Sequence, residues 1–258
     1  MLLSNSSVIV TGAASGLGEA TVRYLAAHED RAHIVLVDLN EDRGKEVADE
    51  IGGTFVRTDI TSPDEVVRLV DTAVGIAPLR GVVNCAGGGK GGRTIGRDGS
   101  YESAHDLDAF IWTVNLNIIG TFNVIRIAAT AMSRNEPDED GGRGAIVNTA
   151  SVAAFDGQIG QAAYAAAKGG VVGMTLPIAR DLSATGIRLN TIAPGTFATP
   201  PMLAVPPKIL ESLGASVPFP KRLGNPSEFG CLAHHLLTNS YMNGETIRLD
   251  GAIRMSPK

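Results

Sequence analysis

The sequence has few of the residues that mark disulfide-rich, metal-binding or nucleic-acid-binding proteins. Only two of its 258 residues are cysteines, too few for a disulfide framework or a thiolate metal site. Cys85 and Cys231 are both expected to be small buried side chains. A net charge of −5 argues against nonspecific binding to nucleic acids or anionic membranes. We therefore expect no bound metal, no nucleic acid and no membrane partner.

Long apolar runs are also lacking. No stretch approaches the roughly 18 consecutive apolar residues of a membrane span. The first strand pattern follows the N-terminal MLLSNSS so closely that no room is left for a signal or transit peptide. These absences predict a cytoplasmic location.

What the sequence does contain is a regular alternation of short apolar runs and helix patterns. Seven runs are typical of strands buried on both faces: VIVT, HIVLVD, TFVRT, GVVNCAG, GAIVNTAS, IRLNTIA and ETIRLDG. Helix starts are indicated by Pro63 after Thr61 and Ser62, and by Pro226 after Asn225. With 44% hydrophobic residues and no internal repeat, the chain can bury one large core. We predict a single α/β domain over residues 1–258, a seven-stranded doubly wound parallel sheet with helices on both faces.

The first apolar run ends in a glycine-rich turn, TGAASGLG, that continues into a helix pattern. Gly12, Gly16 and Gly18 would leave no side chain between the backbone and a pyrophosphate at the helix N-terminus. Their spacing is G-x-x-x-G-x-G, which differs from the G-x-G-x-x-G dinucleotide fingerprint, and such a loop can also be only a tight turn. Together with the residues that follow it, the motif favours a Rossmann fold that binds a dinucleotide.

The second apolar run ends in Asp38, twenty residues after Gly18. A carboxylate here can accept hydrogen bonds from the adenosine ribose hydroxyls, and it would repel a 2′-phosphate. Ser15 and Leu39 provide no cation for such a phosphate, although Arg43 lies nearby in sequence. NAD is therefore the expected cofactor rather than NADP.

Tyr164 and Lys168 are four residues apart in GQAAYAAAKGG, so on a helix they share one face. A neighbouring cation could lower the phenol pKa from about 10 by two or three units, which requires about 3 to 4 kcal/mol of phenolate stabilisation. A phenol tuned in this way can exchange a proton with an alcohol or a carbonyl. The alternative is an alanine-rich buried helix that happens to contain these two residues.

Together these motifs resemble the short-chain dehydrogenase/reductase family, from about Ser7 to Met255. TGAASGLG is similar to the family's cofactor loop, NCAG at 84–87 to its NNAG motif, and GAIVNTAS with GQAAYAAAKGG to its catalytic segments. The resemblance implies four catalytic residues: Asn115, Ser151, Tyr164 and Lys168. It implies cofactor contacts from Gly12, Ser15, Gly16, Leu17, Gly18, Asp38, Asp59, Ile60, Cys85, Ala86, Gly87, Tyr164, Lys168, Pro194, Gly195 and Thr196. The substrate is expected to meet Ser151, Gln158 and Tyr164, and no metal is needed.

Within that family, GTFNVIR, NTASVAAF, GMTLPIARDL and NGETIRLDGAIRM resemble the subgroup of type 2 3-hydroxyacyl-CoA dehydrogenases, also known as type 10 17β-hydroxysteroid dehydrogenases. The resemblance implies reversible NAD-linked oxidation of a short or branched 3-hydroxyacyl-CoA to a 3-ketoacyl-CoA. Oxidation of a hydroxysteroid or another secondary alcohol is an alternative. A 3-oxoacyl-carrier-protein reductase normally prefers NADPH and would carry basic residues that this chain lacks. A non-catalytic scaffold usually loses the tyrosine or lysine, and both are present here.

The sequence also predicts the roles of two loops and the oligomeric state. The proline-bearing run 199–220 is predicted to be a mobile lid over the nicotinamide, because long loops in compact domains are usually functional. Lys90, Arg93 and Arg97 could bind the phosphates of CoA, or could be ordinary solvated surface cations. In relatives, the helices around Asn115 and Tyr164 form the main dimer contact, which implies a homotetramer.

Overall fold

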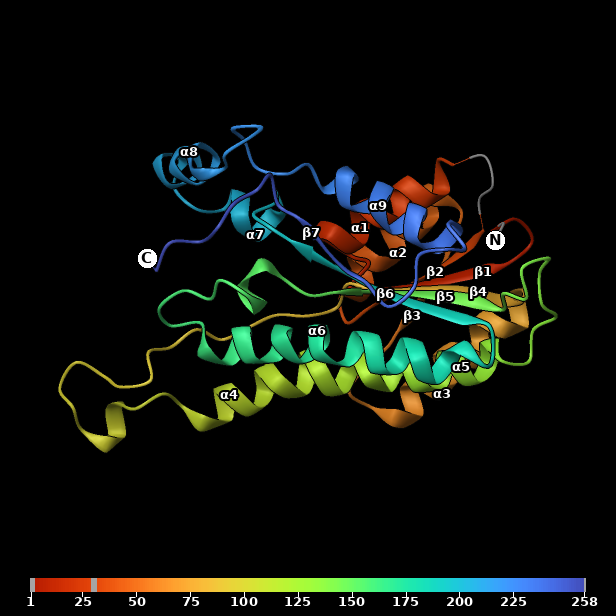
Figure 1. Cartoon of the computed structure of the whole chain (residues 1–258), viewed down its shortest axis with the longest axis horizontal. Helices are drawn as coiled ribbons and strands as arrows, with labels where there is room; N and C mark the ends of the chain where they lie inside the picture. The colour runs from red at the N-terminus through yellow and green to blue at the C-terminus, as the bar shows by residue number, and fades with distance from the viewer. Residues whose placement is uncertain (1–2, 29–31, 258) are drawn as a thin grey trace.

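The computed structural model describes residues 3–28 and 32–257 and shows one α/β domain built on a single parallel sheet (Figure 1). The strand order is β3-β2-β1-β4-β5-β6-β7, and every neighbouring pair is parallel. The strands are β1 Ser7–Thr11, β2 His33–Asp38, β3 Thr54–Arg57, β4 Leu79–Asn84, β5 Gly144–Thr149, β6 Ile187–Pro194 and β7 Thr246–Leu249. All seven predicted strands and the doubly wound Rossmann fold are therefore confirmed.

Helices cover both faces of the sheet, because neighbouring residues of a buried strand point to opposite sides. On one face, Ile9 of β1 packs with helices α3 Pro63–Ile76, α5 Thr121–Met132 and α6 Ala162–Ser183. On the other, Val8 and Val10 pack with α1 Gly16–Ala26, α2 Glu41–Ile51 and α9 Pro226–Thr238. The lower and upper layers of Figure 1 are these two sets of helices.

The predicted helix starts are confirmed by cap geometry. The Ser62 side chain accepts a hydrogen bond from the Glu65 N–H, and Pro63 occupies the first turn of α3. Asn225 and Glu228 form a reciprocal capping box at the start of α9. These caps satisfy backbone N–H groups that a helix cannot bond internally, so the turns that enter the helices are fixed locally.

A long helical segment runs along one side of the sheet. It begins with the short helix η1 Tyr101–Ser103, continues after a break through α4 Leu107–Val114 and the π-helix η2 Asn115–Gly120, and ends with α5. By length and composition alone, Tyr101–Met132 could cross a membrane, with a window of mean hydropathy 1.3 that is 39% buried within the protein. The expectation that no stretch approaches a membrane span was wrong in this respect, because the polar residues interspersed in this segment leave its mean hydropathy high. Core helices of soluble proteins meet the same criteria.

The run predicted as a lid has regular structure of its own. Residues 199–220 contain α7 Pro200–Leu203 and α8 Pro207–Ser216, which lie beyond the carboxyl end of β6 (Figure 1). On the opposite side of the same sheet edge, residues 85–106 leave β4 as an extended loop. These two segments, with the C-terminal residues, border the edge of the sheet where parallel strands end and ligands bind in open α/β folds.

Candidate active site

A cleft of about 620 Å³ opens at the carboxyl ends of the strands, a volume typical of small-molecule sites. Its walls include every residue that the sequence assigned to the cofactor, namely Gly12, Ser15, Gly16, Leu17, Gly18, Asp38, Asp59, Ile60, Cys85, Ala86, Gly87, Tyr164, Lys168, Pro194, Gly195 and Thr196. Ser151 also lines the cleft, as do Thr199, Pro201 and Met202 at the start of the predicted lid. The structure thus brings the dinucleotide motif and the Ser-Tyr-Lys set into one cavity.

The glycine loop is shaped so that side chains would not fit. Gly12 has φ +67°, and a Cβ there would lie 2.8 Å from the Ala86 backbone nitrogen. At Gly18 a Cβ would lie only 2.0 Å from the Gly12 carbonyl oxygen. The loop after β1 therefore packs backbone to backbone against the loop after β4, and α1 starts directly behind it. This arrangement fits a pyrophosphate bound at a helix N-terminus.

Asp38 ends β2 at the rim of the cleft and organises the backbone around it. Its carboxylate accepts hydrogen bonds from the Ala14 N–H at 3.1 Å and from the Asn40 N–H at 3.0 Å. The guanidinium of Arg43 forms ion pairs with Glu19 and, at 2.7 Å, with Glu46. Because two carboxylates hold that guanidinium, it is poorly placed to bind a 2′-phosphate.

Tyr164 and Lys168 lie one turn apart on α6, and the turn after β5 brings Ser151 next to them. The Lys168 ammonium is buried, donates a hydrogen bond to the Thr149 carbonyl at 2.8 Å and lies 5.8 Å from the centroid of the Tyr164 ring. The Ser151 hydroxyl is within hydrogen-bonding reach of the phenol and accepts a hydrogen bond from the Ala153 N–H. The Tyr164 phenol, which can donate a proton, and the Ser151 hydroxyl therefore face the same part of the cleft.

The electrostatics of this pair differ from the expectation. Burial raises the pKa of the Tyr164 phenol, and the hydrogen bond with Ser151 only partly opposes that shift. Burial also lowers the pKa of Lys168 to about 8. The prediction that Lys168 lowers the phenol pKa is therefore wrong for the protein alone. The reason is that both groups are desolvated together, and desolvation disfavours phenolate and ammonium alike.

Asn115 is not part of the site, which corrects the sequence assignment. Its side chain is exposed at the start of η2, whereas Asn117, two residues later, is fully buried. The Asn117 amide donates hydrogen bonds to the carbonyls of Gly88 at 2.6 Å and Thr113 at 2.7 Å, and its oxygen accepts from the Gly88 N–H. A Cβ on Gly87 would lie 2.7 Å from the Asn117 oxygen and 3.2 Å from the Lys168 nitrogen.

Sequence contained a signal for Asn117. Residues two apart on a helix point in nearly opposite directions, so only one of the two asparagines can face the sheet. The buried positions Ala109, Thr113 and Asn117 repeat every four residues and define that face. Asn115 belongs to the other face.

Gln158 is also displaced from its predicted place. It does not line the main cleft, and its amide instead donates a hydrogen bond to the Ser256 carbonyl at 3.0 Å. Gln161 lines the cleft in its stead, at the N-cap of α6 and three residues before Tyr164. The chain turns at Gly160, where φ is +87°, so the six-residue offset does not follow helical geometry.

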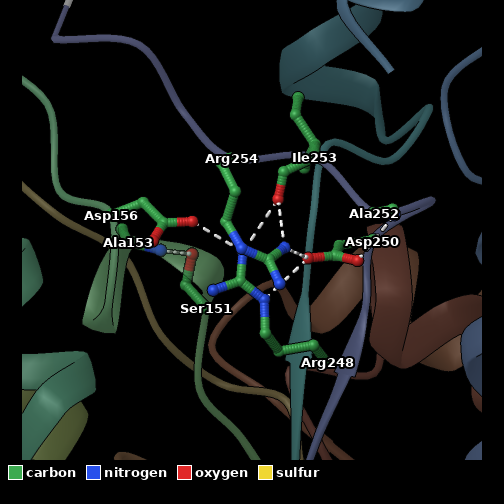
Figure 2. A network of polar contacts seen from close by, with 8 residues as sticks. All are labelled: Ser151, Ala153, Asp156, Arg248, Asp250, Ala252, Ile253 and Arg254. Atoms are coloured by element: carbon green, nitrogen blue, oxygen red, sulfur yellow. Dashed lines mark hydrogen bonds and ion pairs between the residues drawn. The ribbon is translucent and has the colours of Figure 1, made fainter. Parts of the chain in front are cut away.

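The C-terminal residues form part of the wall near the substrate side. Met255 lines the cleft, and the Ile159 N–H donates a hydrogen bond to the Pro257 carbonyl. Figure 2 shows the ion pairs beneath them: the Arg248 guanidinium binds Asp156 at 2.6 Å and Asp250 at 2.7 Å. Arg248 thereby ties β7 to the segment that follows Ser151, and it holds the pKa of Asp156 below its usual range.

The two cysteines behave differently. Cys85 lies on the cleft wall, and burial raises the pKa of its thiol to about 11, so it carries no thiolate at neutral pH. Cys231 is exposed on α9. The expectation of a small buried side chain is therefore wrong for Cys231.

Comparison with known proteins gives consistent results. Residues 6–208 match the profile of the family described as short chain dehydrogenase. The chain is 51% identical to 3-hydroxyacyl-CoA dehydrogenase type-2 of Drosophila melanogaster, over 99% of this chain and all of that protein. It is 48% identical to the human protein of the same name, over 96% and 95%. A crystal structure of 3-hydroxyacyl-CoA dehydrogenase type-2 from Mycobacterium avium superposes with a TM-score of 0.93, at 50% identity and 98% coverage of both chains.

Proposed function

The chain belongs to the short-chain dehydrogenase family, and from that premise we propose that it catalyses reversible NAD-linked oxidation of a short or 2-methyl-branched 3-hydroxyacyl-CoA to the 3-ketoacyl-CoA. The observation that carries this proposal is identity of about half over nearly the full length to proteins named 3-hydroxyacyl-CoA dehydrogenase type-2. An oxidoreductase of this family uses a nicotinamide cofactor and a small-molecule substrate. The residues that line the cleft support both a nicotinamide cofactor and a small-molecule substrate.

Tyr164 is the proton-transfer residue in this proposal. The phenol accepts the hydroxyl proton during oxidation and returns it to the carbonyl during reduction, while Ser151 donates a hydrogen bond that holds the substrate oxygen beside it. When bound, the nicotinamide supplies a hydride acceptor at its C4 atom. Burial raises the phenol pKa, so the phenol must pass its proton on after each oxidation.

Lys168 and Asn117 have supporting roles in this proton transfer. The Lys168 ammonium, buried against the Thr149 carbonyl, would hold the ribose hydroxyls of the nicotinamide half of the cofactor. Asn117 takes the place in the catalytic set that was first assigned to Asn115. It fixes the backbone of Gly88 on the cleft wall and lies close to the Lys168 ammonium. We propose it as the positioning residue of the catalytic set.

NAD is the proposed cofactor rather than NADP. The carboxylate of Asp38 lines the rim of the cleft, where it would repel a 2′-phosphate, and no cation among the residues lining the cleft other than Lys168 could neutralise that charge. Arg43 is held by Glu19 and Glu46. Equal use of NAD and NADP by the purified protein would refute this assignment.

We propose a homotetramer, built in part on the long helices beneath the sheet. Several large apolar side chains are exposed there, including Ile111 at 54%, Ile119 at 51% and Phe122 at 46%. Burying such a face against a second copy removes apolar surface from water. Light scattering coupled to gel filtration measures the mass directly, and a monomer at micromolar concentration would contradict the proposal.

The test of function is a substrate panel with purified protein. NAD reduction is measured with 3-hydroxybutyryl-CoA, with its 2-methyl homologue, with a 17β-hydroxysteroid and with a 3-hydroxyacyl carrier-protein thioester. We expect the highest kcat/KM for the CoA thioesters. A higher value for the steroid or for the carrier-protein thioester would overturn the acyl-CoA assignment and leave the dehydrogenase chemistry intact.

A further inference from the structure

A second hollow of about 500 Å³ lies beside the catalytic cleft. Its walls are the loop 92–97 and the segment 157–165, which includes the first turn of α6. Gln161 lines both cavities, and the neighbouring residues Tyr164 and Ala165 face the cleft and the hollow respectively. A ligand that reaches Tyr164 with one end can therefore pass Gln161 and place its other end in the hollow.

The hollow is cationic although the protein is acidic. Arg93 and Arg97 line it, and no aspartate or glutamate does. Neither arginine forms an ion pair within residues 3–28 and 32–257, whereas Arg43 and Arg248 are each held by two carboxylates. The N-terminal end of α6 adds partial positive charge to the same wall. Guanidinium groups without an acidic partner suit an anion that presents several oxygens.

The loop that carries these arginines is tied to its surroundings. The Gly92 N–H donates a hydrogen bond to the Gly160 carbonyl at 2.9 Å, which joins the two segments that line the hollow. The His105 N–H donates to the Thr94 carbonyl, and Gly92 is so close to the His105 ring that a Cβ would lie 2.2 Å from its Nδ1 atom. The arginines therefore project from a backbone with fixed contacts, which lowers the entropy lost on binding.

The third loop cation has a different position. Lys90 does not line the hollow, and its ammonium lies 5.0 Å from the centre of the Trp112 ring. Of the three loop cations, only Arg93 and Arg97 are in place to meet a ligand that extends from the cleft.

We infer that this hollow binds the phosphate groups at the nucleotide end of the CoA substrate through Arg93 and Arg97, with the pantetheine arm passing Gln161. The inference rests on the proposed function and adds to it a binding site outside the catalytic cleft. Binding energy gained at the remote phosphates assists the chemical step at Tyr164. Exposed arginines that bind phosphate also make that gain sensitive to salt.

The experiment compares Arg93→Ala/Arg97→Ala with the matched variant Arg68→Ala/Arg134→Ala, whose exposed arginines line neither cavity. NADH-linked reduction is measured with acetoacetyl-CoA and with acetoacetyl-N-acetylcysteamine, which has the thioester but no phosphate. We expect the first variant to lose about tenfold in kcat/KM for the CoA substrate only, the loss of one or two charge-assisted contacts. Raising the salt concentration should reproduce this loss in the wild type, and the matched variant should behave as wild type.

Several results would overturn the inference. Equal losses for both thioesters, or no loss for either, would show that the arginines do not bind the phosphates. Loss confined to a carrier-protein thioester would assign them to an acidic carrier domain instead. Failure of the wild type to reduce either thioester, with activity on a steroid, would overturn the proposed function and is seen before any variant is made. Calorimetry with free CoA, wild type against variant, tests binding without turnover.

Discussion

The cleft has two unlike halves. The half that receives the dinucleotide is made largely of short turns after β1, β2, β3, β4 and β6. Its glycines pack closely against neighbouring backbone at Gly12 and Gly18. The half that receives the substrate is made of residues from segments far apart in the sequence: Gly88, Ser151, Gln161, the α7 residues Pro201 and Met202, and Met255. The sheet determines the geometry of the cofactor half. The geometry of the substrate half depends on contacts between segments distant in sequence.

This difference between the two halves indicates which part of the cleft can change its substrate specificity. Turns fixed by parallel strands have few alternative conformations, since a side chain at Gly18 would overlap the Gly12 carbonyl. The substrate half instead depends on single contacts such as Arg248 with Asp156, or Gln158 with the Ser256 carbonyl. Substitutions on that side can alter substrate preference with little effect on cofactor binding. The following predictions test that separation.

The largest effect is expected where the two halves meet. Tyr164→Phe removes only the hydroxyl that transfers the proton, so kcat should fall by about 10² to 10⁴ while NADH affinity stays unchanged. Steady-state kinetics and fluorescence titration with NADH measure the two quantities. Near-normal turnover would disprove the assigned role, and loss of NADH binding would show that the halves are not separable.

Burial of the Lys168 ammonium should make the stability of the folded protein depend on pH. Its folded-state pKa of about 8 lies below the value near 10.4 of an unfolded lysine, so the unfolded chain binds more protons between these values. Wild-type stability should therefore rise with pH across that window, and below it the penalty is on the order of 3 kcal/mol.

Lys168→Met should remove that slope and lose activity. Denaturant unfolding at pH 7.0 and pH 9.5, for both proteins, gives the free energies of unfolding. If the two proteins respond to pH in the same way, the ammonium is not desolvated as the structure indicates.

The two asparagines of η2 provide a matched pair. Asn117→Ala should lower kcat by about tenfold or more, because it leaves the Gly88 backbone groups without their buried partner. Asn115→Ala removes an exposed amide and should leave kcat within about twofold of wild type. Thermal unfolding of both variants separates a local loss from general destabilisation. Equal effects on kcat would contradict the corrected assignment.

The smallest effect concerns the cofactor half. Asp38→Ser together with Leu39→Arg removes the carboxylate and adds a guanidinium, so the ratio of kcat/KM for NADP over NAD should rise about tenfold or more. KM for the acyl-CoA should not change if the two halves are independent. The single variant Leu39→Lys is a useful control, since it keeps Asp38 and should shift the ratio less.

The sequence predicted the cofactor half of the cleft better than the substrate half. The strands were predictable because both faces of the sheet are covered, which makes runs such as HIVLVD continuously apolar. Most cofactor residues followed, since they lie at or shortly after the ends of strands, whereas Tyr164 and Lys168 lie on α6. Asn117 was missed because two asparagines share one segment and the π-helix changes the spacing there. Gln161 was missed because the turn at Gly160 breaks helical spacing, and the raised Tyr164 pKa because burial depends on tertiary packing.

The C-terminal residues have a practical consequence for work with this protein. Met255 lines the cleft, and the Ser256 and Pro257 carbonyls accept hydrogen bonds from Gln158 and Ile159. A segment that is tied down in this way does not tolerate changes as freely as a loose one does. Substitutions that disturb residues 255–257 would therefore move the substrate wall, so a loss of activity in such variants would report the wall as well as the chemistry.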